Sequence, residues 1–186
     1  MSPQEVRRVV TKGRAPRGGA AGGRRRFRLR RASAKDLPTL VRHRRLMWAD
    51  IGSYPSASVE ASDGPYLEWA RRMMRERRLV AFVATSGGEV AGSGALWLRE
   101  EQPRPGDNAG YAPYLLSMYT EPRYRRSGLA TAIVKAAIEW SRARGYRKVE
   151  LHASRDGRPV YEALGFERTW EMRAPLARAE PGRAAH

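Results

Sequence analysis

A basic turn of six residues, Arg125 to Ala130, separates an apolar run from a segment with helical spacing. The apolar run, Tyr114 to Tyr119, predicts a strand, and the segment Thr131 to Arg144 predicts a helix. The chain therefore enters a helix where backbone N–H groups have no helical acceptor, and such a terminus binds anions. The arginines of the turn add fixed positive charge. An ordinary surface turn can have this composition, but the arrangement favours capture of a pyrophosphate.

A second informative stretch follows the predicted helix. Lys148 to Ala153 alternates between polar and apolar residues and predicts another strand. The next residues predict a short helix, which begins near Pro159 and ends at Gly165. Tyr161 lies inside this short helix.

These two stretches together resemble the GNAT superfamily of N-acetyltransferases. The family's acetyl-CoA loop reads Arg/Gln-x-x-Gly-x-Gly/Ala, and Arg125, Gly128 and Ala130 match it. The family's later Tyr-x-x-x-Gly-Phe element is matched from Tyr161 to Phe166. The resemblance covers roughly residues 27 to 172 and is most specific between residues 119 and 166.

The resemblance implies an α/β fold of the α+β type. We expect a mixed, mostly antiparallel sheet with helices on both faces and a central parallel pair of strands that splays apart. The residue patterns predict elements in the order β-α-α-β-β-β-α-β-α-β. In chain order these are Phe27–Arg31, Ala32–Ile51, Pro65–Arg77, Leu79–Ala84, Glu89–Arg99, Tyr114–Tyr119, Thr131–Arg144, Lys148–Ala153, a short helix from Pro159, and Glu167–Met172.

The resemblance also implies where acetyl-CoA binds. Main-chain N–H groups of Arg125, Arg126, Ser127, Gly128, Leu129 and Ala130 are expected to hold its pyrophosphate. The backbone at Met118, Tyr119 and Thr120 is expected to pair with the pantetheine arm as an added strand would. Ser154 stands where the family often has asparagine, so its hydroxyl is a predicted pantetheine contact that departs from the usual residue.

Tyr161 is the predicted general acid. A phenol has a pKa near 10, slightly above that of a thiol, so it can donate a proton to a developing thiolate in a water-poor site. The alternative is a core tyrosine whose ring packs and whose hydroxyl reaches the surface.

The general base is left open by the sequence. The strand Tyr114–Tyr119 carries no glutamate, which is the base in some relatives. Glu100, Glu101, Asp107 and His152 are candidates, acting directly or through water. His152 is equally well explained as a hydrogen-bonded residue of the sheet.

The acceptor amine is expected to bind between the first two helices and the loops at residues 53–64 and 100–112. Trp48, Tyr54 and Tyr66 are the aromatic side chains that would line this site. Trp48 is equally well explained as a core residue. We expect a primary amine of a small molecule or a peptide, and the sequence does not name it.

The net charge of +17 is the most extreme property of the composition. Residues 1–26 carry eight basic residues against one acid and are rich in glycine, which predicts a disordered tail. The predicted domain is residues 27–174, followed by a frayed C-terminal tail at residues 175–186. The charge supports an alternative function: a basic nucleic-acid-associated protein, whose Arg-rich tail binds weakly and without sequence preference.

The remaining features of the sequence limit cofactors and location. The chain has no cysteine, and its three histidines show no metal-ligand spacing, so no metal is expected. No run of residues is long and apolar enough for a membrane helix, and the first residues do not resemble a secretory signal, so we expect a cytoplasmic protein. The sequence does not decide whether the protein forms a homodimer.

Overall fold

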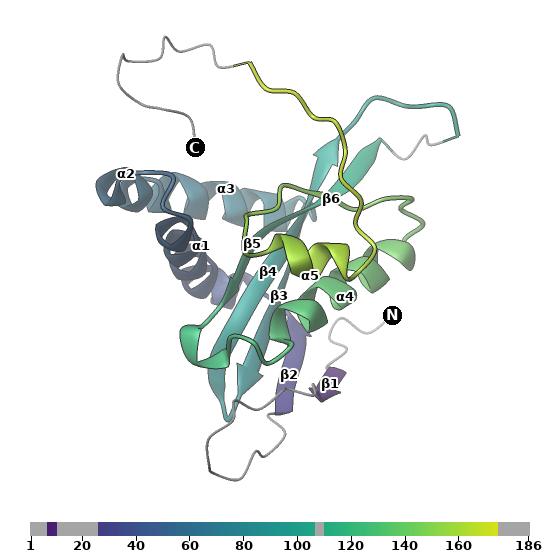
Figure 1. Cartoon of the computed structure of the whole chain (residues 1–186). Coiled ribbons are helices and arrows are strands. Elements are labelled where there is room, and N and C mark those ends of the chain that lie inside the picture. The colour runs from purple at the N-terminus through teal and green to yellow at the C-terminus, as the bar shows by residue number, and fades with distance from the viewer. Residues whose placement is uncertain (1–6, 11–25, 107–109, 175–186) are drawn as a thin grey trace.

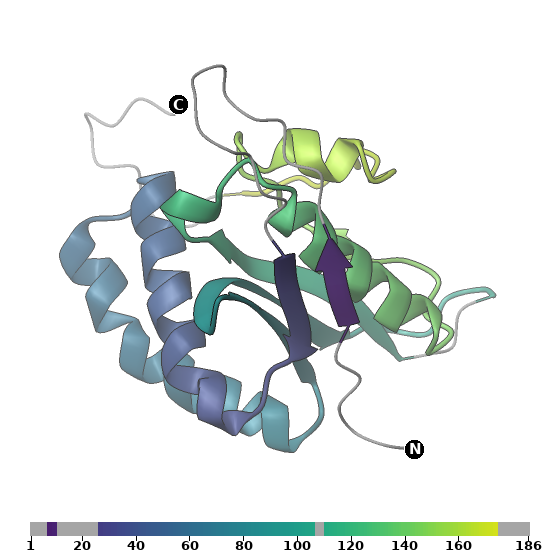
Figure 2. The ribbon, with the colours of Figure 1, turned by 90° about the horizontal axis from the view of Figure 1, so that it is seen from below.

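The computed structural model describes residues 7–10, 26–106 and 110–174. These residues form a six-stranded sheet with helices on both of its faces (Figures 1 and 2). The strands are β1 (Arg7–Val10), β2 (Arg26–Arg31), β3 (Leu79–Ser86), β4 (Glu89–Glu100), β5 (Tyr111–Thr120) and β6 (Glu150–Leu151). The helices are η1 (Ala34–Asp36), α1 (Leu37–Ile51), α2 (Ser56–Ala61), α3 (Asp63–Arg75), η2 (Pro122–Tyr124), α4 (Leu129–Arg142) and α5 (Arg158–Glu162).

The central strand β3 shows why helices cover both faces of the sheet. Its first six residues are all buried apolar residues, and successive side chains point to opposite faces. Leu79, Ala81 and Val83 join one core, whereas Val80, Phe82 and Ala84 join the other. A strand of this kind leaves apolar surface in water unless both faces are packed.

Each face of the sheet has its own helices. Residues of α1 and α3, among them Leu40 and Met73, complete the core on one face. Residues of α4, among them Ile133 and Ala137, complete the core on the other face. Figure 1 shows this arrangement, with α1–α3 on the left of the sheet and α4 and α5 on the right.

The strands follow the order β1-β2-β3-β4-β5-β6, and only β5 and β6 run parallel. The mixed, mostly antiparallel sheet and its parallel pair confirm the fold class expected from the sequence. The parallel pair lies at one edge of the sheet, since residues 167–172, predicted as the last strand, form no ladder.

The missing last strand corrects the sequence prediction. The side chains of Trp170 and Met172 are 95% and 94% exposed, while Glu171 reaches His152 at 2.7 Å between Oε1 and Nε2. Residues 167–172 therefore join no strand of the described sheet, although the Glu171 side chain contacts His152. The loop predicted at residues 53–64 is also partly wrong, because it contains α2.

The N-terminal tail was predicted to be disordered, and four of its residues contradict that prediction. Arg7–Val10 pair antiparallel with Arg26–Leu29 and form strand β1 (Figure 2). The prediction rested on the low average hydrophobicity of all 26 residues. It overlooked that a short segment can satisfy its backbone hydrogen bonds by pairing with an open sheet edge. The rest of that tail, and the predicted frayed tail at residues 175–186, lie outside the described residues.

In the described ranges of the chain, no helix is both long and apolar enough to cross a membrane.

Gly92 provides a test of the packing between β4, β5 and α4. A Cβ added there would lie 2.7 Å from the Tyr119 carbonyl oxygen and 3.2 Å from Leu129 Cδ2. Because the carbonyl belongs to a paired strand, Gly92→Ala must displace backbone, and we expect unfolding free energy to fall by about 1–3 kcal/mol. Urea denaturation measures this loss.

Gly64→Ala is the matched control for Gly92→Ala. A Cβ at Gly64, in α3, meets no atom within 4 Å. Because alanine has less chain entropy to lose than glycine in a helix, stability should stay level or rise by up to about 1 kcal/mol. Equal stability of the two variants would contradict the tight packing at Gly92.

Candidate active site

The turn between β5 and α4 presents a row of free main-chain donors. Gly128 precedes α4 in the left-handed conformation, with φ 80° and ψ 5°. The first backbone hydrogen bond of the helix runs from the Ala132 N–H to the Gly128 carbonyl. Among the described residues, no acceptor faces the N–H groups of residues 126–131. These donors lie at the positive end of α4, an arrangement that suits phosphate oxygens.

Hydrogen bonds and one aromatic contact fix the conformation of the turn. The Arg125 N–H donates to the Pro122 carbonyl at 3.2 Å, and the Ser127 hydroxyl donates to the Tyr124 carbonyl. The buried Tyr124 ring packs edge-on against Phe27, with 5.9 Å between centroids. Arg126 has φ 57°, which costs a non-glycine residue about 1 kcal/mol and persists because these contacts fix its neighbours.

Beside the turn, strand β5 has an open edge. It pairs with β6 only at Tyr114 and Leu115, so in the described part of the chain no strand pairs with that edge from Leu116 to Thr120. The register with β4 also shifts here, and Ser117 has φ 51°. Met118, Tyr119 and Thr120 therefore lie where an extended ligand can add to the sheet.

Tyr161 lies on α5 and packs at the edge of the core around α4. Its ring meets Phe166 edge-on at 5.7 Å between centroids, and burial raises its pKa above 10. Its hydroxyl has no hydrogen-bond partner among the described residues. The phenol is thus protonated at neutral pH and free to donate.

Ser154, the predicted pantetheine contact, has a local role in the structure. Its Oγ accepts the Gly157 N–H at 3.2 Å, and its carbonyl accepts the Arg158 N–H at 3.0 Å. These bonds start α5 and so help to place Tyr161. The hydroxyl proton of Ser154 has no partner among the described residues, so the pantetheine contact stays a prediction.

The structure does not gather the predicted general bases near the turn. Glu101 pairs with Lys148 at 3.1 Å, and His152 lies between Tyr114 and Glu171. Glu100 is opposite Tyr111, at the far end of β5 from Thr120. Asp107 lies outside the described residues. His152 directly follows Leu151, which pairs with Leu115, so it lies beside the start of the open edge of β5, and its role as a base stays a prediction.

The aromatic residues predicted around the acceptor are divided between two places. Trp48 and the exposed Tyr54 meet edge-on, with 5.2 Å between ring centroids. Tyr66 instead is buried in the sheet-facing core, where it stacks on Trp69 and lies under the Arg44 guanidinium.

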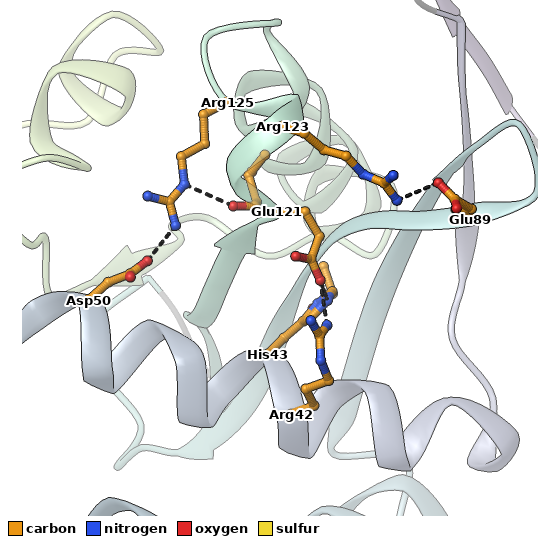
Figure 3. Close-up of polar contacts among 9 residues, drawn as sticks. Arg42, His43, Asp50, Glu89, Glu121, Arg123 and Arg125 are labelled. Atoms are coloured by element: carbon orange, nitrogen blue, oxygen red, sulfur yellow. Dashed lines mark hydrogen bonds and ion pairs between the residues drawn. The ribbon is translucent and has the colours of Figure 1, made fainter. Parts of the chain in front are cut away.

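A buried polar cluster next to the turn was missed by sequence reasoning. His43 of α1 is fully buried, its Nδ1 is 2.8 Å from Ser93 Oγ, and its Nε2 is 3.2 Å from Glu121 Oε1 (Figure 3). Arg42 also donates to Glu121. The only signal was that His43 falls three residues after Leu40, on the apolar side of its helix.

The protonation states of this cluster follow from burial and charge. Burial lowers the pKa of His43 below 6.5; Glu121 opposes this shift, and Arg42 reinforces it. Burial acts to raise the pKa of Glu121, but the hydrogen bond and charge of Arg42 outweigh it, so that pKa is lowered. A neutral His43 ring with its proton on Nε2 donates to Glu121 and accepts from Ser93.

Figure 3 shows a second connection from α1 to the turn. Arg125 Nη2 lies 2.5 Å from Asp50 Oδ2, and its Nε donates to the Thr120 carbonyl at 3.1 Å. Arg123 pairs with Glu89 on the other side. Arg126 has no side-chain partner among the described residues. No cluster of three His, Asp or Glu side chains suited to a metal occurs in the described ranges.

Comparison with known proteins gives this site its family. A model of the Acetyltransferase (GNAT) family matches residues 43–166, which is well over half of the chain. The chain belongs to the GNAT family. The matched segment runs from His43 on α1 to Phe166 after α5.

Individual relatives of this GNAT protein agree. It is 34% identical over 79 residues to glucosamine 6-phosphate N-acetyltransferase of Trypanosoma brucei brucei, a match of 42% of this chain and 52% of the relative. The match thus spans about half the length of that relative. A GCN5-related N-acetyltransferase from Ralstonia eutropha superposes with a TM-score of 0.75 at 25% identity, covering 81% of this chain and 98% of its own.

A second solved structure contains the acetyl donor. A predicted acetyltransferase from Clostridium acetobutylicum, crystallised with acetyl-CoA, superposes with a TM-score of 0.73 at 28% identity. The alignment covers 80% of this GNAT chain and 95% of the other.

The buried His43 predicts a pH-dependent stability. Because the pKa of His43 is lower in the folded than in the unfolded protein, its contribution is complete above pH 6.5 and is lost as pH falls below that value. His43→Gln keeps a donor and an acceptor but cannot titrate. Between about pH 7.5 and 5.5 its unfolding free energy should fall less than that of the wild type, by up to about 1.4 kcal/mol per pH unit. Equal slopes in urea denaturation would show that His43 titrates normally.

Proposed function

We propose that this protein transfers an acetyl group from acetyl-CoA to a primary amine of a small molecule or a peptide. The observation that carries the proposal is the continuity of two features. The free N–H groups of residues 126–131 suit a pyrophosphate, and they adjoin the unpaired edge of β5. Their combination fits a ligand with an anionic group at one end and an extended arm at the other.

The residues divide the chemistry as follows. Gly128 and its neighbours hold the pyrophosphate, and the β5 backbone at Met118–Thr120 pairs with the arm and polarises the thioester carbonyl through an N–H group. The neutral amine attacks the carbonyl carbon, and the C–S bond breaks as the new C–N bond is completed. Tyr161 gives its hydroxyl proton to the departing thiolate, the new amide nitrogen releases its extra proton to water, and the Tyr161 phenolate takes a proton back from water. The raised pKa of Tyr161 keeps that proton in place until charge develops on sulfur.

The relatives support the two substrates of this proposal. The Clostridium acetobutylicum structure contains acetyl-CoA, and its chain aligns over most of this one. The Trypanosoma brucei brucei relative is named for an amine acceptor, glucosamine 6-phosphate. An amino sugar is therefore a sensible first acceptor to assay.

Gly128→Val tests the phosphate cradle. The substitution puts a β-branched residue at φ 80° and adds bulk where the backbone approaches the pyrophosphate. We expect acetyl-CoA affinity, measured by calorimetry, to fall at least tenfold. Gly145→Val is the matched control, because Gly145 has φ 77° at the opposite end of α4 and shares the strain without touching the turn. Equal affinities in the two variants would refute the assignment of the cradle.

Tyr161→Phe tests the general acid. The ring and its contact with Phe166 remain, and only an unpartnered hydroxyl is removed. Turnover should fall about 10²–10⁴-fold with little change in acetyl-CoA affinity, because the proton is needed only as the thiolate leaves. A variant within about threefold of wild type would mean that water or Ser154 supplies the proton.

A further inference from the structure

Asp50 lies at an electrostatically unusual place, in the last turn of α1. The carbonyl end of a helix carries partial negative charge, which disfavours a carboxylate and favours a cation. The last turn of α1 contains no basic residue of its own. A carboxylate at this position creates a local site for a positive group.

The positive group now beside Asp50 is the guanidinium of Arg125. Its Nη2 is 2.5 Å from Asp50 Oδ2, and its Nε donates to the Thr120 carbonyl at 3.1 Å. One guanidinium therefore separates the Asp50 carboxylate from the end of β5, beside the proposed thioester site. Both partners are about half exposed, at 44% for Arg125 and 51% for Asp50, and exposed pairs of this kind are weak and readily exchanged.

The frame around this pair is more rigid than the pair itself. His43, on the same helix, is buried and joined to both Ser93 and Glu121. This contact fixes α1 against the start of the turn. The positions of α1 and the end of β5 therefore do not depend on the contact between Arg125 and Asp50 that Figure 3 shows.

We propose that Arg125 occupies an ammonium subsite, and that Asp50 binds the protonated amine of the acceptor once the pyrophosphate has drawn Arg125 away. The inference rests on the proposed function, because it needs the pyrophosphate at residues 126–131. A pyrophosphate diester carries two negative charges spread over four non-bridging oxygens, so it offers a guanidinium a better partner than an exposed carboxylate does. The freed carboxylate and the negative end of α1 then attract a cation to the place next to Thr120. The acceptor class is thus an amine that arrives as ammonium. Asp50 binds and orients it without forming a covalent bond, and the ammonium gives a proton to water before the neutral amine attacks.

Asp50→Asn tests the subsite because it keeps the shape and removes the charge. Acetyl-CoA should bind about two- to fivefold more tightly in calorimetry, since the phosphate no longer competes with a carboxylate for Arg125. With glucosamine 6-phosphate or kanamycin, whichever the wild type acetylates faster, KM for the amine should rise tenfold or more, and kcat should change much less.

Glu89→Gln is the matched control for Asp50→Asn. It removes the charge from the Arg123–Glu89 pair, a second exposed guanidinium–carboxylate contact on the same segment, and keeps a side-chain oxygen that the Tyr124 hydroxyl can reach. We expect acetyl-CoA affinity and the amine KM to stay within about twofold of wild type.

Two results would overturn the subsite. Weaker acetyl-CoA binding in Asp50→Asn would mean that Asp50 only braces Arg125, and an unchanged amine KM would mean that the amine binds elsewhere. The calorimetric measurement needs no acceptor. It therefore tests whether Arg125 leaves Asp50 for the pyrophosphate even before an acceptor is known. Failure of the proposed function is a different outcome, since wild-type protein would then bind no acetyl-CoA at all.

Discussion

The two-residue ladder between β5 and β6 is the constraint on which the candidate site depends. If the parallel pairing continued beyond Leu115, the backbone of Met118–Thr120 would be hydrogen-bonded to protein and closed to ligand. The ladder nevertheless has to exist, because it brings α5 and Tyr161 back to the sheet after the crossover through α4. Because the parallel pair exists, Tyr161 has a fixed position. Because it is short, the edge of β5 stays free for an extended ligand.

The direction of α4 places the partial positive charge of its N-terminus near the open edge of β5. Its N-terminus faces the end of β5, and Gly128 lets the chain turn there without a side chain in the way. Two sets of contacts fix the segment that precedes the free N–H groups. Glu121 pairs with Arg42 and His43, and the Tyr124 ring packs on Phe27. Donors held in place before binding need no reorganisation when an anion arrives, which is the usual source of strong anion sites in helix termini.

The sequence predicted the parts of this arrangement that are local. Gly128 follows Arg125 by three residues, and Tyr161 precedes Gly165 by four, so each belongs to a short motif that resembles the GNAT family. Their roles at the site stay predictions. The two-faced apolar run of β3 and the hairpin into β4 were readable because they too are local. These elements were found with boundaries within a few residues of the observed ones.

What the sequence could not show depends on contacts between distant segments. Asp50 and Arg125 are 75 residues apart, and His43 is 50 residues from Ser93, so no spacing announces either contact. The alternation around Trp170 resembled a strand because alternation reports two faces and says nothing about a pairing partner. The sequence also did not predict that His43 is buried, because a polar residue among the apolar positions of a helix is read as an exposed one.

Strand β1 has a consequence for the solution behaviour of the protein. The edge of β2, Arg26–Arg31, would present unpaired N–H and C=O groups without it, and such an edge invites strands from other molecules. By pairing with that edge, Arg7–Val10 leave a four-residue strand as the edge of the sheet, and a short edge strand limits intermolecular sheet growth. Removing Arg7–Val10 would therefore leave the candidate site in place and yet yield a protein more prone to aggregate.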